Sequence, residues 1–180
     1  VGTVRTRYDL SFLEPRLFGT LTSFGLDLYN TSRKSVGGRD YREERRGGAV
    51  SLGRRFSKYL QGNVRFKHEE VEISDIDESF LEVNRQPEEY RNRSSTTQSI
   101  EVSATHDTRD YFKFPRSGHR NRLSLEYAGL GGDNEFTKIV AGTEQYFPLG
   151  EKWVLHLDGQ VGAAFEMGSS ETVPLQERFF

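Results

Sequence analysis

The chain has 180 residues, so its length permits a soluble sandwich, a small closed barrel or part of a large barrel. Its 25 basic and 27 acidic residues give a formal net charge of -2 without a basic block, which argues against nucleic acid as a partner. It has no Cys and no run of roughly 18 apolar residues, which excludes a disulfide scaffold, a Cys-ligated metal and a membrane helix.

The composition still permits a barrel that crosses a membrane with strands. The 18 Gly and the 12% aromatic content favour β structure. The mean hydropathy of -0.71 does not contradict a membrane protein, because a barrel strand of about 9–11 residues turns only every second side chain to lipid. Nothing after Val1 resembles a signal peptide, so the signal of an exported protein is expected to be removed or to lie upstream.

The first predicted strand covers residues 4–12, where apolar and polar side chains alternate with a period of two. Its even positions are mostly apolar, whereas Arg5 and Arg7 lie on the opposite face. A short turn at residues 14–19 leads to a second strand at residues 22–28. The two strands are therefore predicted to form a hairpin.

The same alternation continues along the chain and predicts eight strands in total. The pattern is clearest in the last strand and weakest in the seventh. The eight predicted strands cover residues 4–12, 22–28, 48–56, 60–73, 100–106, 122–127, 136–147 and 153–165.

Two kinds of link alternate between these strands. Short links are predicted at residues 14–19, 57–59, 107–118 and 148–151, and longer polar links at 31–42, 74–94, 129–134 and beyond 166. Outer-membrane barrels have short turns at one end and long loops at the other. The fold class predicted is therefore all-β, an antiparallel up-and-down transmembrane β-barrel.

The polar face of the predicted strands suits a water-filled lumen. Its charged members are Arg5, Arg7, Asp9, Arg65, Lys67, Glu101, Arg122 and Asp158. Aromatic residues near strand ends predict interfacial girdles, and they are Tyr29, Phe56, Tyr59, Tyr146, Phe147 and Trp153. The alternative is that the polar face is the solvent side of a soluble sheet, but soluble strands are usually shorter, about 5–6 residues.

Several motifs resemble a known family. The run from Asp107 to Asp110 reads Asp-Thr-Arg-Asp, and Phe114 to Gly118 reads Phe-Pro-Arg-Ser-Gly. Further matching stretches follow at residues 131–138, 146–149 and 173–180, and one precedes at 12–19. In this order and over nearly the whole chain, they resemble the BamA-type family of outer-membrane protein assembly factors.

The motif residues also have a physical interpretation of their own. Pro115 fixes its φ and Gly118 permits a positive φ, so this segment can reverse direction tightly. Asp107, Arg109 and Asp110 are candidates to pair with one another or with turn amides, which would fix the register of the flanking strands. The alternative is that they shape a turn and do nothing more.

The resemblance also has implications for domain organisation. It identifies residues 1–180 as the N-terminal half of a 16-stranded outer-membrane barrel, with the periplasmic repeats and the C-terminal half of the barrel absent. In the family the stretch Glu177, Arg178, Phe179 and Phe180 leads to a loop in the lumen with an Arg-Gly-Phe motif. An isolated half-sheet would expose two unpaired edges, so this segment alone is not expected to be the functional unit.

The function implied by the resemblance is the folding and insertion of client proteins in the outer membrane of a Gram-negative-type bacterium, without a cofactor. The implied partners are unfolded outer-membrane protein clients, accessory assembly lipoproteins and the lipid bilayer. Two alternatives are a polypeptide-secreting barrel of the two-partner type and a porin-like or ligand-binding outer-membrane barrel.

The sequence does not predict an enzyme. The four His residues, at positions 68, 106, 119 and 156, are dispersed and lack the spacing of a metal site. Ser103 and His106 lie on opposite faces of one predicted strand, so they cannot form a nucleophile and base pair. We therefore expect no catalytic, metal-binding or cofactor-binding residues.

Overall fold

A computed structural model describes residues 2–36, 41–74 and 93–167 of the chain. Eight strands form one antiparallel sheet in which each strand pairs with its neighbours in sequence, so the predicted all-β, up-and-down fold is confirmed. The elements are β1 (Gly2–Glu14), η1 (Leu17–Gly19), β2 (Thr22–Val36), β3 (Tyr41–Arg55), β4 (Leu60–Ser74), β5 (Arg93–Asp107), β6 (Gly118–Gly132), β7 (Phe136–Leu149) and β8 (Trp153–Glu166).

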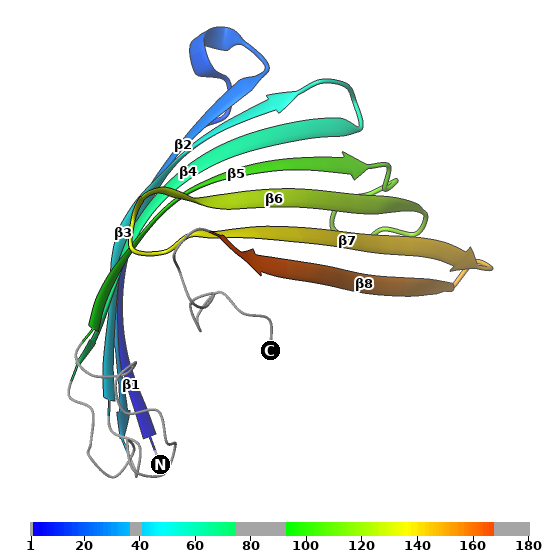
Figure 1. Ribbon diagram of the computed structural model, residues 1–180. Helices are drawn as coiled ribbons and strands as arrows, with labels where there is room; N and C mark the ends of the chain where they lie inside the picture. Colours follow the sequence, from blue (N-terminus) through cyan, green and yellow to red (C-terminus); the bar gives the residue numbers. More distant parts are fainter. Residues whose placement is uncertain (1, 37–40, 75–92, 168–180) are drawn as a thin grey trace.

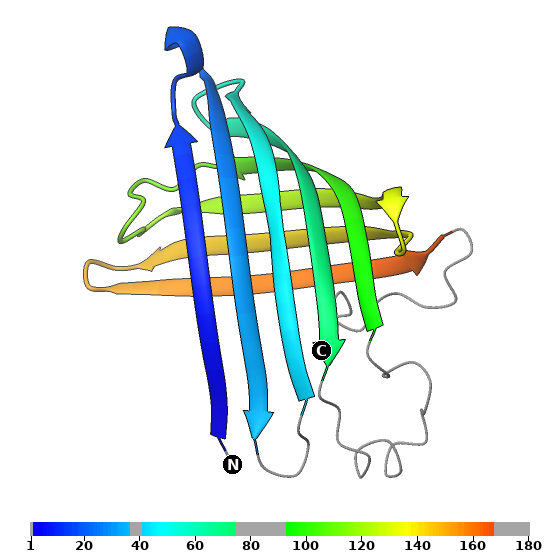
Figure 2. The same cartoon turned by 90° about the vertical axis from the view of Figure 1, so that its left-hand side faces the viewer.

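The sheet is a single curved layer (Figure 1) in which β1 to β4 run across the direction of β6 to β8 (Figure 2). Side-chain contacts show which face is concave. The Lys67 Nζ atom lies 3.3 Å from a Glu126 carboxylate oxygen two strands away. Because neighbouring strands are about 4.8 Å apart, side chains reach past a whole strand only where curvature brings them together. The polar face is therefore the concave one.

The convex face of the sheet is apolar and exposed. Cross-strand pairs such as Leu26 with Val50 and Phe66 with Ile100 continue from strand to strand across it. Val102 on this face has 52% of its surface exposed. A continuous apolar surface of this kind is unfavourable in water and is stable against lipid, as on the outside of a membrane barrel.

The strands extend beyond the apolar band. On β2 the outward side chains are Phe24, Leu26 and Leu28, and the next outward residues are polar, beginning with Asn30. Strands β2 to β6 each have 15 residues, whereas about 9–11 residues cross a bilayer. On β2 and β3 both faces are polar in these extensions, and an Arg46–Glu70 ion pair of 2.9 Å joins β3 to β4 there.

These extensions correct two of the predicted loops. Most of the predicted loop at 31–42 belongs to β2 and β3, and the predicted loop at 129–134 lies mostly within β6. Apolar alternation could not reveal the β2 and β3 segments, because polar side chains occupy both of their faces. In β6 the alternation is interrupted by Gly129, Gly131 and Gly132. The division into short and long links is also wrong for the described links, since 108–117 is longer than 133–135.

We call the end of the sheet that carries links 15–21, 56–59, 108–117 and 150–152 the turn end. The predicted loop at 74–94 falls mostly outside the described residues, as does the link beyond 166. No helix within the described ranges is long and apolar enough to cross a membrane.

Two of the six predicted girdle aromatics lie on the concave face instead. The Tyr29 hydroxyl donates a 2.7 Å hydrogen bond to Glu69, and the Tyr146 hydroxyl donates one of 3.1 Å to Glu144. Their parity along β2 and β7 directs them inward, where a hydroxyl finds carboxylate partners. The other four are exposed, and they are Phe56, Tyr59, Phe147 and Trp153.

Candidate functional site

The link between β5 and β6 folds back tightly on itself. The Thr108 amide donates to the His119 carbonyl at 2.8 Å, and the Asp110 amide donates to the Ser117 carbonyl at 3.2 Å. Gly118 has a φ of 98°, and a Cβ atom there would lie 2.4 Å from the Thr108 carbonyl oxygen. Only glycine fits this position without moving the backbone, because it has no Cβ atom and tolerates a positive φ.

Asp110 closes the link from within. Its Oδ1 atom accepts backbone hydrogen bonds from Tyr111 at 2.8 Å, Arg116 at 2.9 Å and Ser117 at 3.2 Å. The bond from the Arg116 amide is the largest of the effects that hold the pKa of Asp110 below its usual range, because backbone donors stabilise the ionised carboxylate. The ionised form of Asp110 therefore maintains the shape of the link.

Asp107 and Arg109 form a two-pronged ion pair at the start of the link. The Arg109 Nε atom donates to Asp107 Oδ1 at 2.9 Å, and Nη2 donates to Oδ2 at 2.8 Å. The Arg109 side chain is only 11% exposed. Planar, two-pronged contacts of this type fix direction as well as distance, so the Arg109 guanidinium is held toward the next hairpin.

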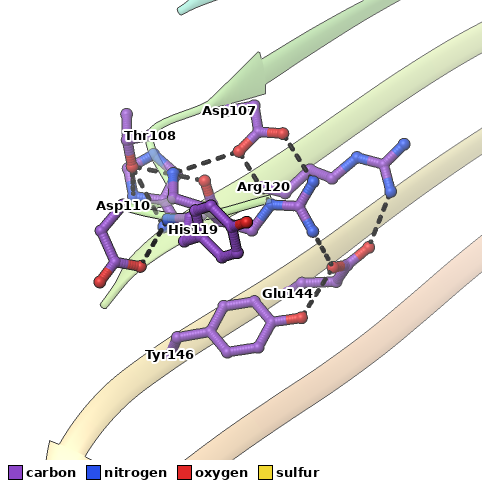
Figure 3. Close-up of polar contacts among 9 residues, drawn as sticks. Asp107, Thr108, Asp110, His119, Arg120, Glu144 and Tyr146 are labelled. Atoms are coloured by element: carbon purple, nitrogen blue, oxygen red, sulfur yellow. Dashed lines mark hydrogen bonds and ion pairs between the residues drawn. The ribbon is translucent and has the colours of Figure 1, made fainter. Parts of the chain in front are cut away.

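Glu144 on β7 is the centre of the resulting network. Figure 3 shows its carboxylate between the side chains of Arg120 and Tyr146. It accepts hydrogen bonds from Arg109 at 3.5 Å, from Arg120 at 3.2 Å and from the Tyr146 hydroxyl at 3.1 Å. The β5–β6 link is thereby attached to the wall of the sheet two strands farther along the chain.

A pair of histidines lies beside this network, on the other face of the sheet. His106 Nδ1 and His119 Nε2 are 3.0 Å apart, and Thr108 Oγ1 lies 3.1 Å from His119 Nδ1. The backbone amide of Asp107 donates to the Tyr59 carbonyl at 2.8 Å. The Asp107–Tyr59 bond joins the β3–β4 link to the end of β5, and the histidine contacts join that end of β5 to the start of β6.

Arg116 extends the same assembly to the β7–β8 link. Its Nη2 atom donates to the carbonyl oxygens of Gly150, at 3.4 Å, and Glu151. The β5–β6 link thus bridges the links on both sides of it and clamps the turn end of the sheet. Within the described ranges no group of three or more His, Asp or Glu side chains is placed to hold a metal ion.

The structure brings four of the predicted site residues into this clamp, namely Asp107, Arg109, Asp110 and Gly118. Pro115 lies in the same link. The other four predicted residues, Glu177, Arg178, Phe179 and Phe180, lie outside the described residues.

Sequence reasoning missed Glu144, Arg120 and Tyr146 as members of the network. The alternation places Glu144 on the polar face of its strand, and the hairpin register sets it directly opposite Arg120. A register worked out from the short turns would therefore have identified the Arg120–Glu144 pair. The reach of Arg109 across two strands depends on curvature, which the sequence pattern does not specify.

The outer edge of β1 is a second candidate site. Among the described residues β1 pairs only with β2, and β8 pairs only with β7. An edge strand presents a row of backbone N–H and C=O groups that are free to pair with another strand. In a bilayer each unsatisfied backbone group costs several kcal/mol, so a strand edge within the apolar band is stable only when it is paired.

The pattern of the Omp85 superfamily domain matches residues 1–180, the entire chain. The chain belongs to the Omp85 superfamily. Omp85 proteins are outer-membrane proteins of Gram-negative bacteria, and this location agrees with the apolar convex face of the sheet. The predicted membership of an outer-membrane barrel family is confirmed.

Two relatives illustrate the resemblance. The chain is 29% identical over 178 residues to the outer membrane protein assembly factor BamA of Nitratidesulfovibrio vulgaris, and the match covers 98% of this chain and 22% of the relative. It superimposes with a TM-score of 0.80 on the crystal structure of BamA from Haemophilus ducreyi lacking POTRA domains 1-3, at 18% identity. That match covers 97% of this chain and 36% of the solved chain, so this Omp85 segment spans well under half of either relative.

Proposed function

We propose that the protein to which this chain belongs folds and inserts other β-barrel proteins into the outer membrane, and that it does so by strand pairing without catalysis or a cofactor. The single observation that carries this proposal is the match of residues 1–180 to the Omp85 superfamily domain, and the β1 edge suggests where a client strand would be received. In the described sheet β1 has a neighbour on one side only, and its convex side chains are apolar. The name of the Nitratidesulfovibrio relative, an assembly factor, supports the same function.

The proposed mechanism uses the bilayer as the driving force. A client strand that enters the membrane leaves its backbone groups unsatisfied until it pairs, whereas pairing along β1 supplies hydrogen bonds to each of them. Apolar side chains such as Tyr8, Leu10 and Phe12 stand beside that edge and keep it at membrane depth. Pairing is therefore favourable without an external energy source.

Unfolded outer-membrane proteins and the lipid bilayer are the partners required by this mechanism. Accessory assembly lipoproteins are proposed from the family resemblance, and the turn end is the part of the described sheet that suits them best. Its exposed aromatic side chains, Tyr111, Phe112 and Phe114, project from a link that is clamped by hydrogen bonds.

A second candidate function is the export of a polypeptide through the lumen. The observation that favours it is the polar concave face, where charged side chains such as Arg65 and Asp27 pair at 3.0 Å and would contact a chain in transit. Export and insertion differ in the surface that contacts the client. An exported chain would touch the concave face, whereas an inserted client would touch the β1 edge.

Cysteine cross-linking tests the proposal directly, because the chain has no native Cys. Single variants Thr6→Cys, Tyr8→Cys and Leu10→Cys would be made in the full-length protein, reconstituted in liposomes, and mixed with an unfolded client that carries a single Cys in its final strand. We expect disulfides between the β1 positions and the client strand. When the Cys on β1 moves by two residues, the client Cys position that gives the highest yield should also move by two residues.

Val64→Cys on β4 is the matched control, since it also lies on the convex face but its strand is paired on both sides. This control should give no cross-link. Equal cross-linking at Val64 and at the β1 positions would contradict insertion at the edge. Cross-links confined to concave positions such as Arg65→Cys would favour export.

A further inference from the structure

The concave face contains a hollow of about 480 Å³ at the turn end. Its walls come from the β1–β2 link and from strands β2 to β6. Four arginine side chains line it from the concave face, and no Asp or Glu lines it. Its other lining groups are mostly hydroxyl and amide side chains, including Ser103 and Gln61. The four arginines are Arg16, Arg55, Arg120 and Arg122. Arg54 also borders the hollow, but its position on β3 places its side chain on the convex face.

Two of these four arginines have no ion-pair partner among the described residues. Arg120 pairs with Glu144 at 3.2 Å and Arg122 pairs with Glu101 at 3.5 Å. The Arg16 and Arg55 guanidinium groups form no ion pair with a carboxylate of the described residues. The Glu14 carboxylate accepts a 2.9 Å hydrogen bond from the Arg16 amide and offsets part of the charge there, so Arg55 carries the least compensated positive charge of the hollow.

The β1–β2 link that contains Arg16 is attached to the end of β3 next to Arg55. The Arg55 amide donates a 3.2 Å hydrogen bond to the Leu21 carbonyl, which attaches the β1–β2 link to the end of β3. Arg16 lies in that link, and Leu21 lines the same hollow. The positive charge of Arg16 and Arg55 therefore lies on backbone that is fixed by hydrogen bonds to the sheet.

The opposite end of the same face has a different charge pattern. The hollow there has five arginines, but four carboxylates are interleaved with them, and ion pairs such as Arg65–Asp27 at 3.0 Å neutralise most of the charge. The charged side chains that line the hollow at the turn end are therefore all basic, whereas those that line the opposite end have both signs. Those nine residues are Arg5, Arg7, Arg33, Arg45, Arg65, Asp9, Asp27, Glu43 and Glu69.

We propose that the arginine hollow binds an acidic segment of an extended polypeptide at the mouth of the barrel. This inference rests on the proposed function and names the chemistry of the client segment that is received there. From β2 to β6 the hollow crosses four strand spacings, roughly 19 Å, which an extended segment of about six residues would span. A single small anion would contact only part of that length.

The polar lining favours a polypeptide over a phospholipid. Serine, threonine, asparagine and glutamine side chains can bind carboxylates and backbone amides, whereas acyl chains would find almost no apolar wall. Opposite charge also accelerates the encounter of a flexible chain with the barrel. The hollow therefore acts as an electrostatic entrance for acidic client segments.

The test compares two charge-matched double variants of the full-length protein in detergent micelles. Arg16→Gln with Arg55→Gln removes the unpaired charges of the hollow, and Arg33→Gln with Lys34→Gln removes two charges at the opposite end. The probe is a fluorescent twelve-residue Glu/Ser peptide, followed by anisotropy. We expect the hollow variant to raise its Kd about tenfold, equivalent to roughly 1.4 kcal/mol, and the control variant to leave it unchanged.

Equal weakening in both variants would overturn the inference, because it would show general charge attraction. A second outcome would also overturn the inference. In that outcome inorganic phosphate or phosphatidylglycerol micelles displace the peptide, whereas a Lys/Ser peptide and phosphatidylcholine do not. The ligand of the hollow would then be a phosphate group. Client folding is assayed with the same preparations. If the wild-type protein does not promote client folding, the proposed function is contradicted. If it does promote folding but the Arg16 and Arg55 substitutions leave the peptide Kd unchanged, only the inference about the hollow is contradicted.

Discussion

At the scale of single residues, the turn end depends on positions where only one chemistry fits. Gly118 combines a φ of 98° with a backbone oxygen 2.4 Å from the site of a Cβ atom. Asp110 satisfies three backbone donors with one oxygen atom. The sequence suggested both residues as turn formers, but it did not show that they support a clamp across three links.

Gly118→Ala should destabilise the folded protein by about 1–3 kcal/mol, because the new methyl group would force the backbone out of a left-handed conformation. The measurement is the urea midpoint of the full-length protein in lipid vesicles. Gly142→Ala is the control, since its nearest neighbour, the Gly159 carbonyl, is 3.8 Å away. Similar midpoints for the two variants would contradict the proposed role of Gly118.

The Asp110 link should depend on pH in the acid range. The folded state lowers the pKa of Asp110, so its contribution to stability is complete above the unfolded value of about 3.9 and is lost as the pH falls through the lower folded value. NMR shifts of the Arg116 and Ser117 amides should titrate with a midpoint below 3.9 and should not titrate in Asp110→Asn. A midpoint at or above 3.9 in the wild-type protein would contradict this account.

At the scale of strands, alternation located all eight elements and assigned their faces correctly. It underestimated their length, because the segments beyond the apolar band are polar on both faces. Residues 31–36 of β2 look like a loop in sequence and are a strand in the structure. Their order comes from the ladders with β1 and β3, which need no apolar period in the sequence.

The depth of a residue on the convex face should decide the cost of placing a charge there. Val50→Arg, in the middle of the apolar row on β3, should cost about 2–4 kcal/mol, whereas Asn30→Arg, outside the apolar row on β2, should cost about 0–1 kcal/mol. Urea titration in lipid vesicles measures both. Equal costs would mean that lipid does not contact Val50.

The Lys67–Glu126 pair should be coupled across the intervening strand. The two groups are 3.3 Å apart, and their side chains are 21% and 12% exposed. Lys67→Met should destabilise the sheet by roughly 1–3 kcal/mol, because Glu126 loses a partner for its charge. Lys67→Met should lower the free energy of unfolding by less in a Glu126→Gln background. A double-mutant cycle that shows no coupling energy between the two positions would contradict the concave geometry.

At the scale of the whole molecule, the sequence predicted the family but not the arrangement of charge. Motifs spread along the chain identified the barrel class, and the Omp85 match confirmed it. The Glu144 network and the arginine hollow arise only when curvature brings side chains of separate strands together. Curvature is a property of the assembled sheet, so a strand-by-strand pattern does not reveal either site.

The central claim is that the convex face contacts lipid and the concave face lines water. The most direct measurement is site-directed spin labelling of successive β4 positions, Val64, Arg65, Phe66 and Lys67, in the full-length protein in lipid nanodiscs. We expect accessibility to a water-soluble relaxer at Arg65 and Lys67, and to oxygen dissolved in lipid at Val64 and Phe66. Accessibility to the water-soluble relaxer at all four positions would contradict the claim. So would accessibility to that relaxer at Val64 and Phe66 together with accessibility to oxygen at Arg65 and Lys67.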